Sequence, residues 1–186
     1  MKPTLQILIA VGVLILITFS ASDCHTTDVQ PTQVLIVPGE GIAGVRLGDS
    51  QSTVESILGK LDFGGIADGL YRAWFSAEYS SGEHSGLAVY FIEVDNRPGP
   101  VDLITVRAPY GGRSKEGIGI GSSLVSVHRS YGLPKRTYLS ALDHWIADFY
   151  CFGSRHLEIH YKDSLVTTIS TGYFLPMLQD TSYACR

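Results

Sequence analysis

The chain has 186 residues, of which 45% are hydrophobic and 17% are charged, and its mean hydropathy of +0.14 is high for a soluble protein. Its 14 basic and 18 acidic residues give a net charge of −4, so it lacks the basic excess typical of nucleic-acid binding. The hydrophobic content is too high for a disordered chain, and one long apolar run is too little for a multispan membrane protein.

The first element is an apolar run from Leu5 to Phe19, with the sequence LQILIAVGVLILITF. Lys2 precedes it and the small residues Ser20–Ser22 follow it, which is the arrangement of a secretory signal peptide. At about fifteen residues, the run is shorter than the roughly 20 that a membrane-spanning helix needs. We therefore expect residues 1–23 to be a signal peptide. An uncleaved N-terminal anchor and a helix of the folded core are the alternatives, in that order.

The three cysteines are Cys24, Cys151 and Cys185. Cys24 comes directly after Ala21-Ser22-Asp23, a position that resembles the lipobox of bacterial lipoproteins, in which the cysteine is lipidated and becomes the new N-terminus. Asp23 departs from that pattern, because a small residue normally precedes the cysteine. If Cys24 carries lipid, an even pair remains, and exported chains tend to pair their thiols, which favours a disulfide between Cys151 and Cys185. The alternative is a buried free Cys151 and a frayed Cys185.

Residues 24–37 read as a polar tether and a lead-in strand, after which an internal repeat begins. Segments 44–59 and 117–132 align at an offset of 73. The matching pairs are Gly44/Gly117, Val45/Ile118, Leu47/Ile120, Gly48/Gly121, Ser50/Ser123, Val54/Val127 and Gly59/Gly132. Each segment predicts a helix that a serine hydroxyl caps at the start and a glycine ends. The first repeat is assigned to residues 38–113, the second to 114–179, and the C-terminal tail to 180–186.

Alternating apolar residues after each predicted helix indicate strands. They lie at 71–79, 87–95 and 101–106 in the first repeat, and at 145–151, 157–161 and 165–169 in the second. The predicted fold class is therefore α+β: two tandem repeats, each a helix followed by about three antiparallel strands, with one sheet face packed on the helix. One repeat of roughly 65–70 residues would be marginal alone, so we expect a shared core and a hinge at 111–117.

These glycines, caps and apolar positions, which span about residues 38–174, resemble two families. The first copy is similar to the BamE-like small envelope lipoproteins, and the tandem arrangement is similar to the secreted β-lactamase inhibitor proteins. The resemblance implies a protein without catalytic residues, and the second family implies binding of an enzyme on a concave sheet. The long turn at 93–100 departs from the usual pattern of the first family.

The strongest pattern for metal chemistry is His156-x-Glu158-x-His160, because alternate residues of a strand share a face and can offer zinc or copper two imidazoles and a carboxylate. The competing interpretation, which we favour, is a solvated face opposite Leu157 and Ile159. Gly117-x-Gly119-x-Gly121 lacks the spacing of a phosphate loop and is interpreted as a turn. Scattered acids, among them Asp143 and Asp148, are expected to be solvated, and no cofactor is predicted.

Aromatic side chains in the predicted strands are candidates for partner binding on an exposed sheet face. They are Trp74, Tyr79, Tyr90, Trp145 and Tyr150. The alternative is that they fill the junction between the repeats.

Together these features predict an exported, extracytoplasmic and non-enzymatic protein-interaction module of the cell envelope, held at the membrane by an N-terminal lipid or helix. Its expected partner is an envelope protein, and no nucleic acid is expected. The alternatives are a soluble secreted binder or inhibitor of an enzyme and, less favoured, a metal-dependent hydrolase that uses His156, Glu158 and His160.

Overall fold

The computed structural model describes residues 35–60, 65–67, 74–79, 86–94, 97–139, 145–173 and 185, with the backbone alone for 65–67, 74–79 and 93–94. The predicted signal peptide, Cys24, Asp143 and most of the tether and tail lie outside these ranges. Within the described ranges, no helix is long and apolar enough to cross a membrane.

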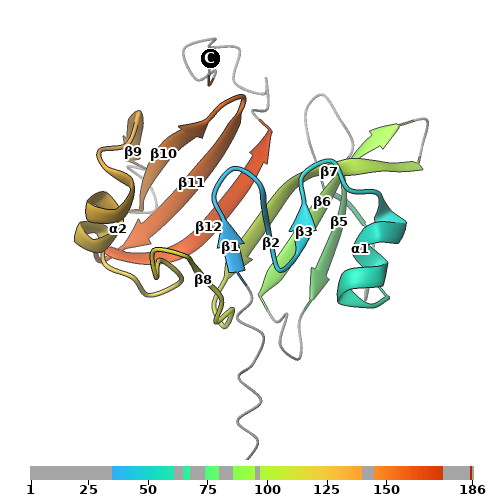
Figure 1. The fold of residues 1–186 in the computed structure, drawn as a ribbon, viewed down its shortest axis with the longest axis horizontal. Helices are drawn as coiled ribbons and strands as arrows, with labels where there is room; N and C mark the ends of the chain where they lie inside the picture. The colour runs from blue at the N-terminus through green and yellow to red at the C-terminus, as the bar shows by residue number, and fades with distance from the viewer. Residues whose placement is uncertain are drawn as a thin grey trace, which may run out of the picture. The chain divides into compact units, whose positions relative to one another are not determined.

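The described elements are two helices and two sheets (Figure 1). The helices are α1 (Gln51–Leu58) and α2 (Leu124–Tyr131). The smaller sheet has the order β3-β2-β1-β8 and consists of β1 (Leu35–Val37), β2 (Gly41–Ile42), β3 (Val45–Arg46) and β8 (Arg113–Ser114). The larger sheet consists of β4 (Gly65–Ala67), β5 (Trp74–Tyr79), β6 (Leu87–Val94), β7 (Arg97–Arg107), β9 (Arg136–Leu139), β10 (Ile146–Phe152), β11 (Arg155–Lys162) and β12 (Leu165–Tyr173). Its order is β4-β5-β6-β7-β12-β11-β10-β9.

The order of elements is the same after each helix. The strands β4 to β7 follow α1, the strands β9 to β12 follow α2, and the large sheet is symmetrical about the pair β7–β12. Each helix is thus followed by four strands. The sequence predicted only three, because it did not predict the short strands β4 and β9. Antiparallel pairing of β7 with β12, from Arg107 opposite Thr168 to Leu103 opposite Gly172, joins the two sets into one sheet. That the two halves arose by duplication stays an interpretation of the sequence.

Both helices begin and end at the capping residues predicted from the sequence. The Ser50 hydroxyl accepts a hydrogen bond from the Thr53 amide at 3.2 Å, and Ser123 accepts one from Ser126 at 3.1 Å. Gly59 and Gly132 end the helices with φ values of 86° and 79°, a left-handed conformation that glycine adopts without strain. Eight residues make a helix too short to be stable alone, so tertiary packing must hold each one in place.

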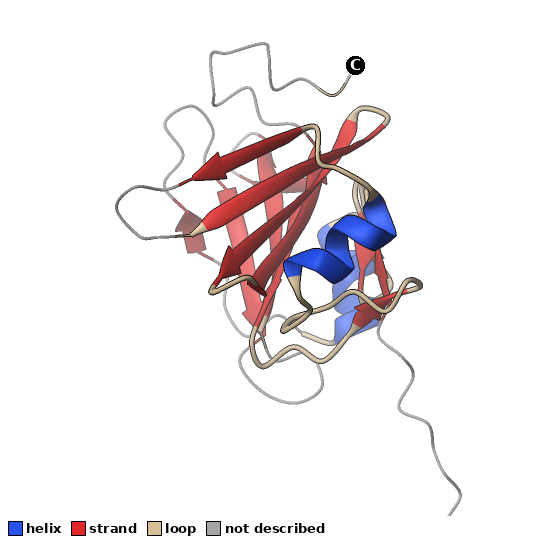
Figure 2. Ribbon diagram, turned by 90° about the vertical axis from the view of Figure 1, so that its left-hand side faces the viewer, coloured by secondary structure: helices blue, strands red, loops and turns tan. Residues whose placement is uncertain are grey.

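That packing takes place on one face of the large sheet, here called the inner face. Both helices and the four-stranded sheet lie on this side (Figure 2). Val54 of α1 and Val127 of α2 are fully buried there. They share one hydrophobic cluster with sheet residues from both halves, among them Leu87, Val89, Phe91, Ile104, Val106, Leu157, Ile159, Tyr161 and Ile169.

The segment expected to be a hinge, residues 111–117, is instead tied into the small sheet. It contains β8, which pairs in parallel with β1, placing Leu35 opposite Arg113. Ser114 is buried, and its amide donates to the carbonyl of Ile118 at 2.7 Å. The chain therefore passes from the first half to the second through ordered structure.

Candidate interaction surface on the open face of the sheet

The open face is the side of the large sheet opposite the inner face, and no described helix covers it. Paired residues of neighbouring strands point to the same side of a sheet, so the ladder assigns residues to it. One row contains Cys151, His156, Gly172, Leu103 and Tyr90. The next contains Arg136, Phe149, Glu158, Ser170, Thr105 and Ala88, and the third contains Tyr138, Ala147, His160, Thr168 and Arg107.

The middle of the open face is built from small side chains, Ser170, Thr105, Ala88 and Gly172. The hydroxyls of Thr105 and Ser170 share a hydrogen bond of 3.0 Å across β7 and β12. A Cβ at Gly172 would lie 2.8 Å from the Asp102 carbonyl and from Leu103 Cδ1, so a larger residue would push these neighbours apart. Ala88 and Ser170 are only 8% and 7% exposed, whereas Thr105 between them is half-buried. Larger side chains, among them Phe149, Tyr90 and Leu103, lie next to this strip in the ladder.

The side chains that lie beside this strip are partly apolar and aromatic. Tyr90, Leu103, Phe149 and Trp145 are each half-buried, and burial raises the pKa of the Tyr90 hydroxyl. The Trp145 ring stacks on His160 with 4.7 Å between centroids and 20° between planes. This stacking restricts the motion of both rings.

The structure brings together two of the three predicted metal ligands. His160 Nε2 lies 2.6 Å from Glu158 Oε1, whereas His156 packs at 6.1 Å on the Phe149 ring. His156 is only 7% exposed, its Nδ1 has no hydrogen-bond partner, and burial lowers its pKa although Glu158 opposes this effect. In the described ranges no group of three His, Cys, Asp or Glu side chains is placed to hold an ion. The predicted metal site is therefore not preformed.

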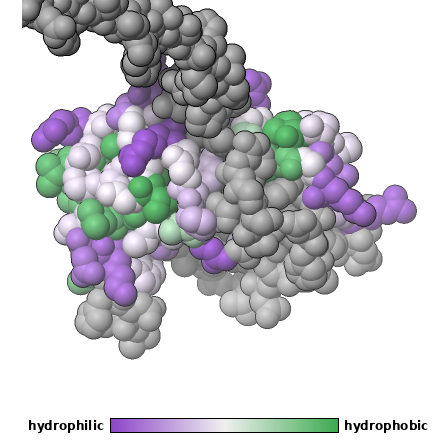
Figure 3. Space-filling view, turned by 90° about the horizontal axis from the view of Figure 1, so that it is seen from below, coloured by the Kyte–Doolittle hydropathy of each residue, from purple (hydrophilic) through white to green (hydrophobic). Residues whose placement is uncertain are grey.

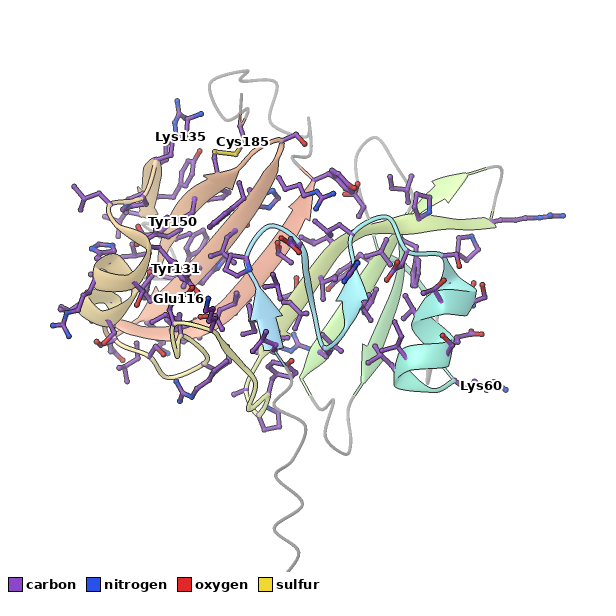
Figure 4. All side chains as sticks on the ribbon, in the orientation of Figure 1. Lys60, Glu116, Tyr131, Lys135, Tyr150 and Cys185 are labelled. Atoms are coloured by element: carbon purple, nitrogen blue, oxygen red, sulfur yellow. A yellow bond between two sulfur atoms is a disulfide. The ribbon has the colours of Figure 1, made fainter. Side chains whose placement is uncertain are left out.

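The predicted aromatic set divides between the two faces. Tyr90 lies on the open face, and the Trp145 ring contacts His160 there. Tyr150 lies on the inner face, where it is 5% exposed and packs edge-to-face on Tyr131 of α2 at 5.7 Å (Figure 4). Its predicted role in partner binding is thus corrected to one in the core.

For Trp74 and Tyr79, only the backbone of β5 is described. Trp74 is paired with Ile92, and Tyr79 with Leu87. Their role in partner binding stays a prediction.

The inner face contains a buried acid that the sequence did not predict. Asp148 is fully buried on the inner face, where Thr137 donates to its Oδ1 at 2.6 Å and His128 Nε2 lies 2.7 Å from its Oδ2. The expectation that Asp148 is solvated is therefore wrong. Burial together with the nearby Asp148 carboxylate raises the pKa of Tyr161. These hydrogen bonds tie α2, β9 and β10 together.

The described residues also line a shallow, open depression of about 250 Å³ on the small sheet. Its lining is Leu35, Val37, Glu40, Gly41, Gly44, Val45 and Arg46. The volume lies just below the range of small-molecule sites, and the lining holds no histidine, cysteine or hydroxyl side chain. We assign no chemistry to it.

The predicted disulfide is confirmed. Cys151 is bonded to Cys185, with 5.4 Å between their Cα atoms. Since Cys151 lies on β10, this bond fixes the end of the chain to the sheet. A disulfide is consistent with an extracytoplasmic location, because oxidising compartments favour such bonds.

Comparisons with known proteins reveal the fold and no family. No protein-family model and no curated sequence matches the chain. A DUF4309 family protein (YjgB) from Bacillus subtilis has a similar structure, with a TM-score of 0.50, 12% identity, and coverage of 73% of this chain and 88% of that one. At this identity the likeness shows the fold alone.

Two further solved structures match at lower TM-scores. A cysteine-rich secretory protein (SAV1118) from Staphylococcus aureus gives a TM-score of 0.49 at 10% identity, over 79% of this chain and 50% of that one. A candidate β-lactamase inhibitor protein from Streptococcus mutans gives 0.28 at 12% identity, over 67% of this chain and 82% of that one. A relation to BamE-like lipoproteins is not shown.

Proposed function

We propose that this chain is an exported, non-enzymatic protein-interaction module of the cell envelope that binds a protein partner on the open face of its large sheet. The observation that carries the proposal is the open face itself. No described helix covers it, and half-buried side chains of Tyr90, Leu103, Phe149 and Trp145 stand beside a strip of small residues. Aromatic side chains are enriched at protein-binding surfaces.

The side-chain chemistry of the described residues supports binding over catalysis. The pair His128–Asp148 is engaged in holding α2 on the sheet, and the pair Glu158–His160 is closed on itself at 2.6 Å. The hydroxyl beside the first pair, that of Thr137, donates to Asp148 Oδ1 at 2.6 Å and so belongs to the same structural network. A metal-dependent hydrolase at His156 would require this face to rearrange.

Export and membrane attachment belong to the same proposal and rest on the sequence. The apolar run before Cys24 supports export, and the disulfide of Cys151 with Cys185 agrees with an oxidising compartment. Cys24→Ser followed by membrane fractionation tests the lipid. We expect the variant to leave the membrane fraction, and a variant that stays there would contradict lipid attachment through Cys24.

Site-specific photo-crosslinking in cells tests the binding face. A photoreactive phenylalanine analogue at Tyr90 on the open face should give discrete high-mass adducts of the full chain. The same analogue at Ser56, which is exposed on α1, is the control and should not give those adducts. Adducts from position 56 and none from position 90 would indicate that the partner binds another surface. The absence of adducts at both positions would contradict the proposal.

A further inference from the structure

The second half of the molecule carries an apolar and basic end at the free edge of the large sheet, in which only Arg136 and Tyr138 also belong to the open face. We call residues 124–139, which form α2, a short loop and β9, the α2–β9 end. Of the large hydrophobic side chains described, the three most exposed all lie here: Val125 at 63%, Leu133 at 85% and Leu139 at 74%. The α2–β9 end faces the viewer in Figure 2, at the free edge of the large sheet.

The charge of this end has the opposite sign to the chain as a whole. Residues 117–142 contain no Asp or Glu, although the full chain has 18 acidic against 14 basic residues. Arg129 and Lys135 are exposed between the apolar side chains, and Lys135 projects away from the sheet (Figure 4). Seen from below, hydrophobic and hydrophilic groups alternate on the side of α2, at the left of Figure 3.

The first helix serves as an internal comparison, because α1 and α2 align residue by residue at an offset of 73. Val125, Arg129 and Leu133 correspond to Ser52, Ser56 and Lys60. Both helices are eight residues long with serine caps and buried valines, so the fold does not require aliphatic residues at these outer positions. The fold therefore does not explain the exposed aliphatic side chains of Val125 and Leu133.

We infer that the α2–β9 end docks on an anionic phospholipid surface. Aliphatic side chains that protrude singly, with basic residues between them, match the interface of a bilayer, where the apolar tips enter the acyl boundary and the cations meet phosphate. A protein interface would favour aromatic anchors, and none of the exposed residues of this end is aromatic.

The inner-face network makes this end a firm platform. Asp148 of β10 is bonded to His128 of α2 and to Thr137 of β9, so the helix and the edge strand are held to one residue of the sheet. A membrane-bound end held in this way would orient the whole domain at the bilayer. The inference is independent of the open face and of any N-terminal anchor.

Vesicle flotation tests the inference on residues 31–186, a compact unit that contains every described helix, strand and core residue and lacks the apolar run. The probes are vesicles of phosphatidylcholine alone and of phosphatidylcholine mixed with phosphatidylglycerol. We expect binding to the anionic vesicles that weakens with added salt, and little binding to the neutral ones. Binding that ignores both phosphatidylglycerol and salt, or no binding to either vesicle, would overturn the inference.

Matched variants locate the contact. Val125→Ser with Leu133→Ser should reduce binding at least about tenfold, and Arg129→Ser with Lys135→Ser should reduce it about fivefold for each cation removed. Ile57→Ser with Lys60→Ser on α1 is the control and should leave binding unchanged, with circular dichroism confirming that each variant is folded. Equal losses in the control would overturn the inference. Loss of cellular protein adducts in the α2 variants, without vesicle binding by the wild type, would assign this end to an acidic protein instead.

Discussion

Asp148 is one of two acids buried in the described core, and the other is Asp102. Its carboxylate is fully buried, and its two oxygens are bonded to Thr137 and His128. Asp148→Ala would leave both partners without their acceptor, a change that costs roughly 3 kcal/mol of the free energy of unfolding for a buried pair. Urea denaturation of residues 31–186 measures this. Glu40→Ala, at an exposed position, is the control and should change stability by less than about 0.5 kcal/mol.

His156 gives the protein an acid-sensitive site on the open face. Burial lowers its pKa in the folded state, so as the pH falls the unfolded chain takes up this proton first. The stability that depends on neutral His156 is complete above the unfolded pKa of about 6.5 and is lost as the pH falls below it. His156→Gln should therefore flatten the fall in the urea midpoint between neutral and mildly acidic pH. A variant as acid-sensitive as the wild type would contradict this assignment.

At the residue scale, the sequence predicted the disulfide but not the sides of the sheet. Phe149 and Tyr150 are adjacent, so each of the two faces of β10 carries an aromatic residue. The sequence of β10 therefore does not show which face points away from the core. The structure turns Tyr150 inward together with Asp148, because its hydroxyl and ring pack under α2. A buried acid in an alternating apolar run could not be recognised without knowing that His128 would meet it.

At the scale of elements, the helix caps are the best-determined features, and they can be tested singly. Ser123→Ala removes the acceptor of the Ser126 amide and should cost about 1 kcal/mol. Ser130→Ala, on the exposed side of the same helix, should be neutral or slightly stabilising because alanine has the higher helix propensity. Thermal unfolding of both variants measures the difference. Equal midpoints would show that the cap does not hold α2.

Local sequence signals place the helices but not the strand pairs. Serine caps and terminal glycines are local signals, and α1 and α2 lie where those signals place them. The pairing of β7 with β12 joins residues more than sixty positions apart, such as Thr105 and Ser170, and no local pattern specifies it. The edge strands β4 and β9 are too short to show a clear alternation.

At the scale of the whole molecule, one sheet and one core make the two halves interdependent. The β7–β12 ladder and a cluster that includes Val106 and Ile169 join them. We expect residues 31–186 to unfold in one transition, with circular dichroism and tryptophan fluorescence giving the same midpoint. Residues 38–113 and 114–179 produced separately should remain unfolded. A folded half, or two separate transitions, would contradict a shared core.

If the open face of the large sheet binds the partner, a bulky charged side chain in the middle of that face should block binding. Thr105 lies in the middle of this face, and Thr53 is exposed on α1, so the matched changes Thr105→Arg and Thr53→Arg place the same bulk and charge on and off the surface. The measurement is the amount of partner complex recovered after chemical crosslinking in cells that express each variant of the full chain. We expect Thr105→Arg to abolish the complex and Thr53→Arg to preserve it. An undiminished complex with Thr105→Arg would contradict binding on the open face.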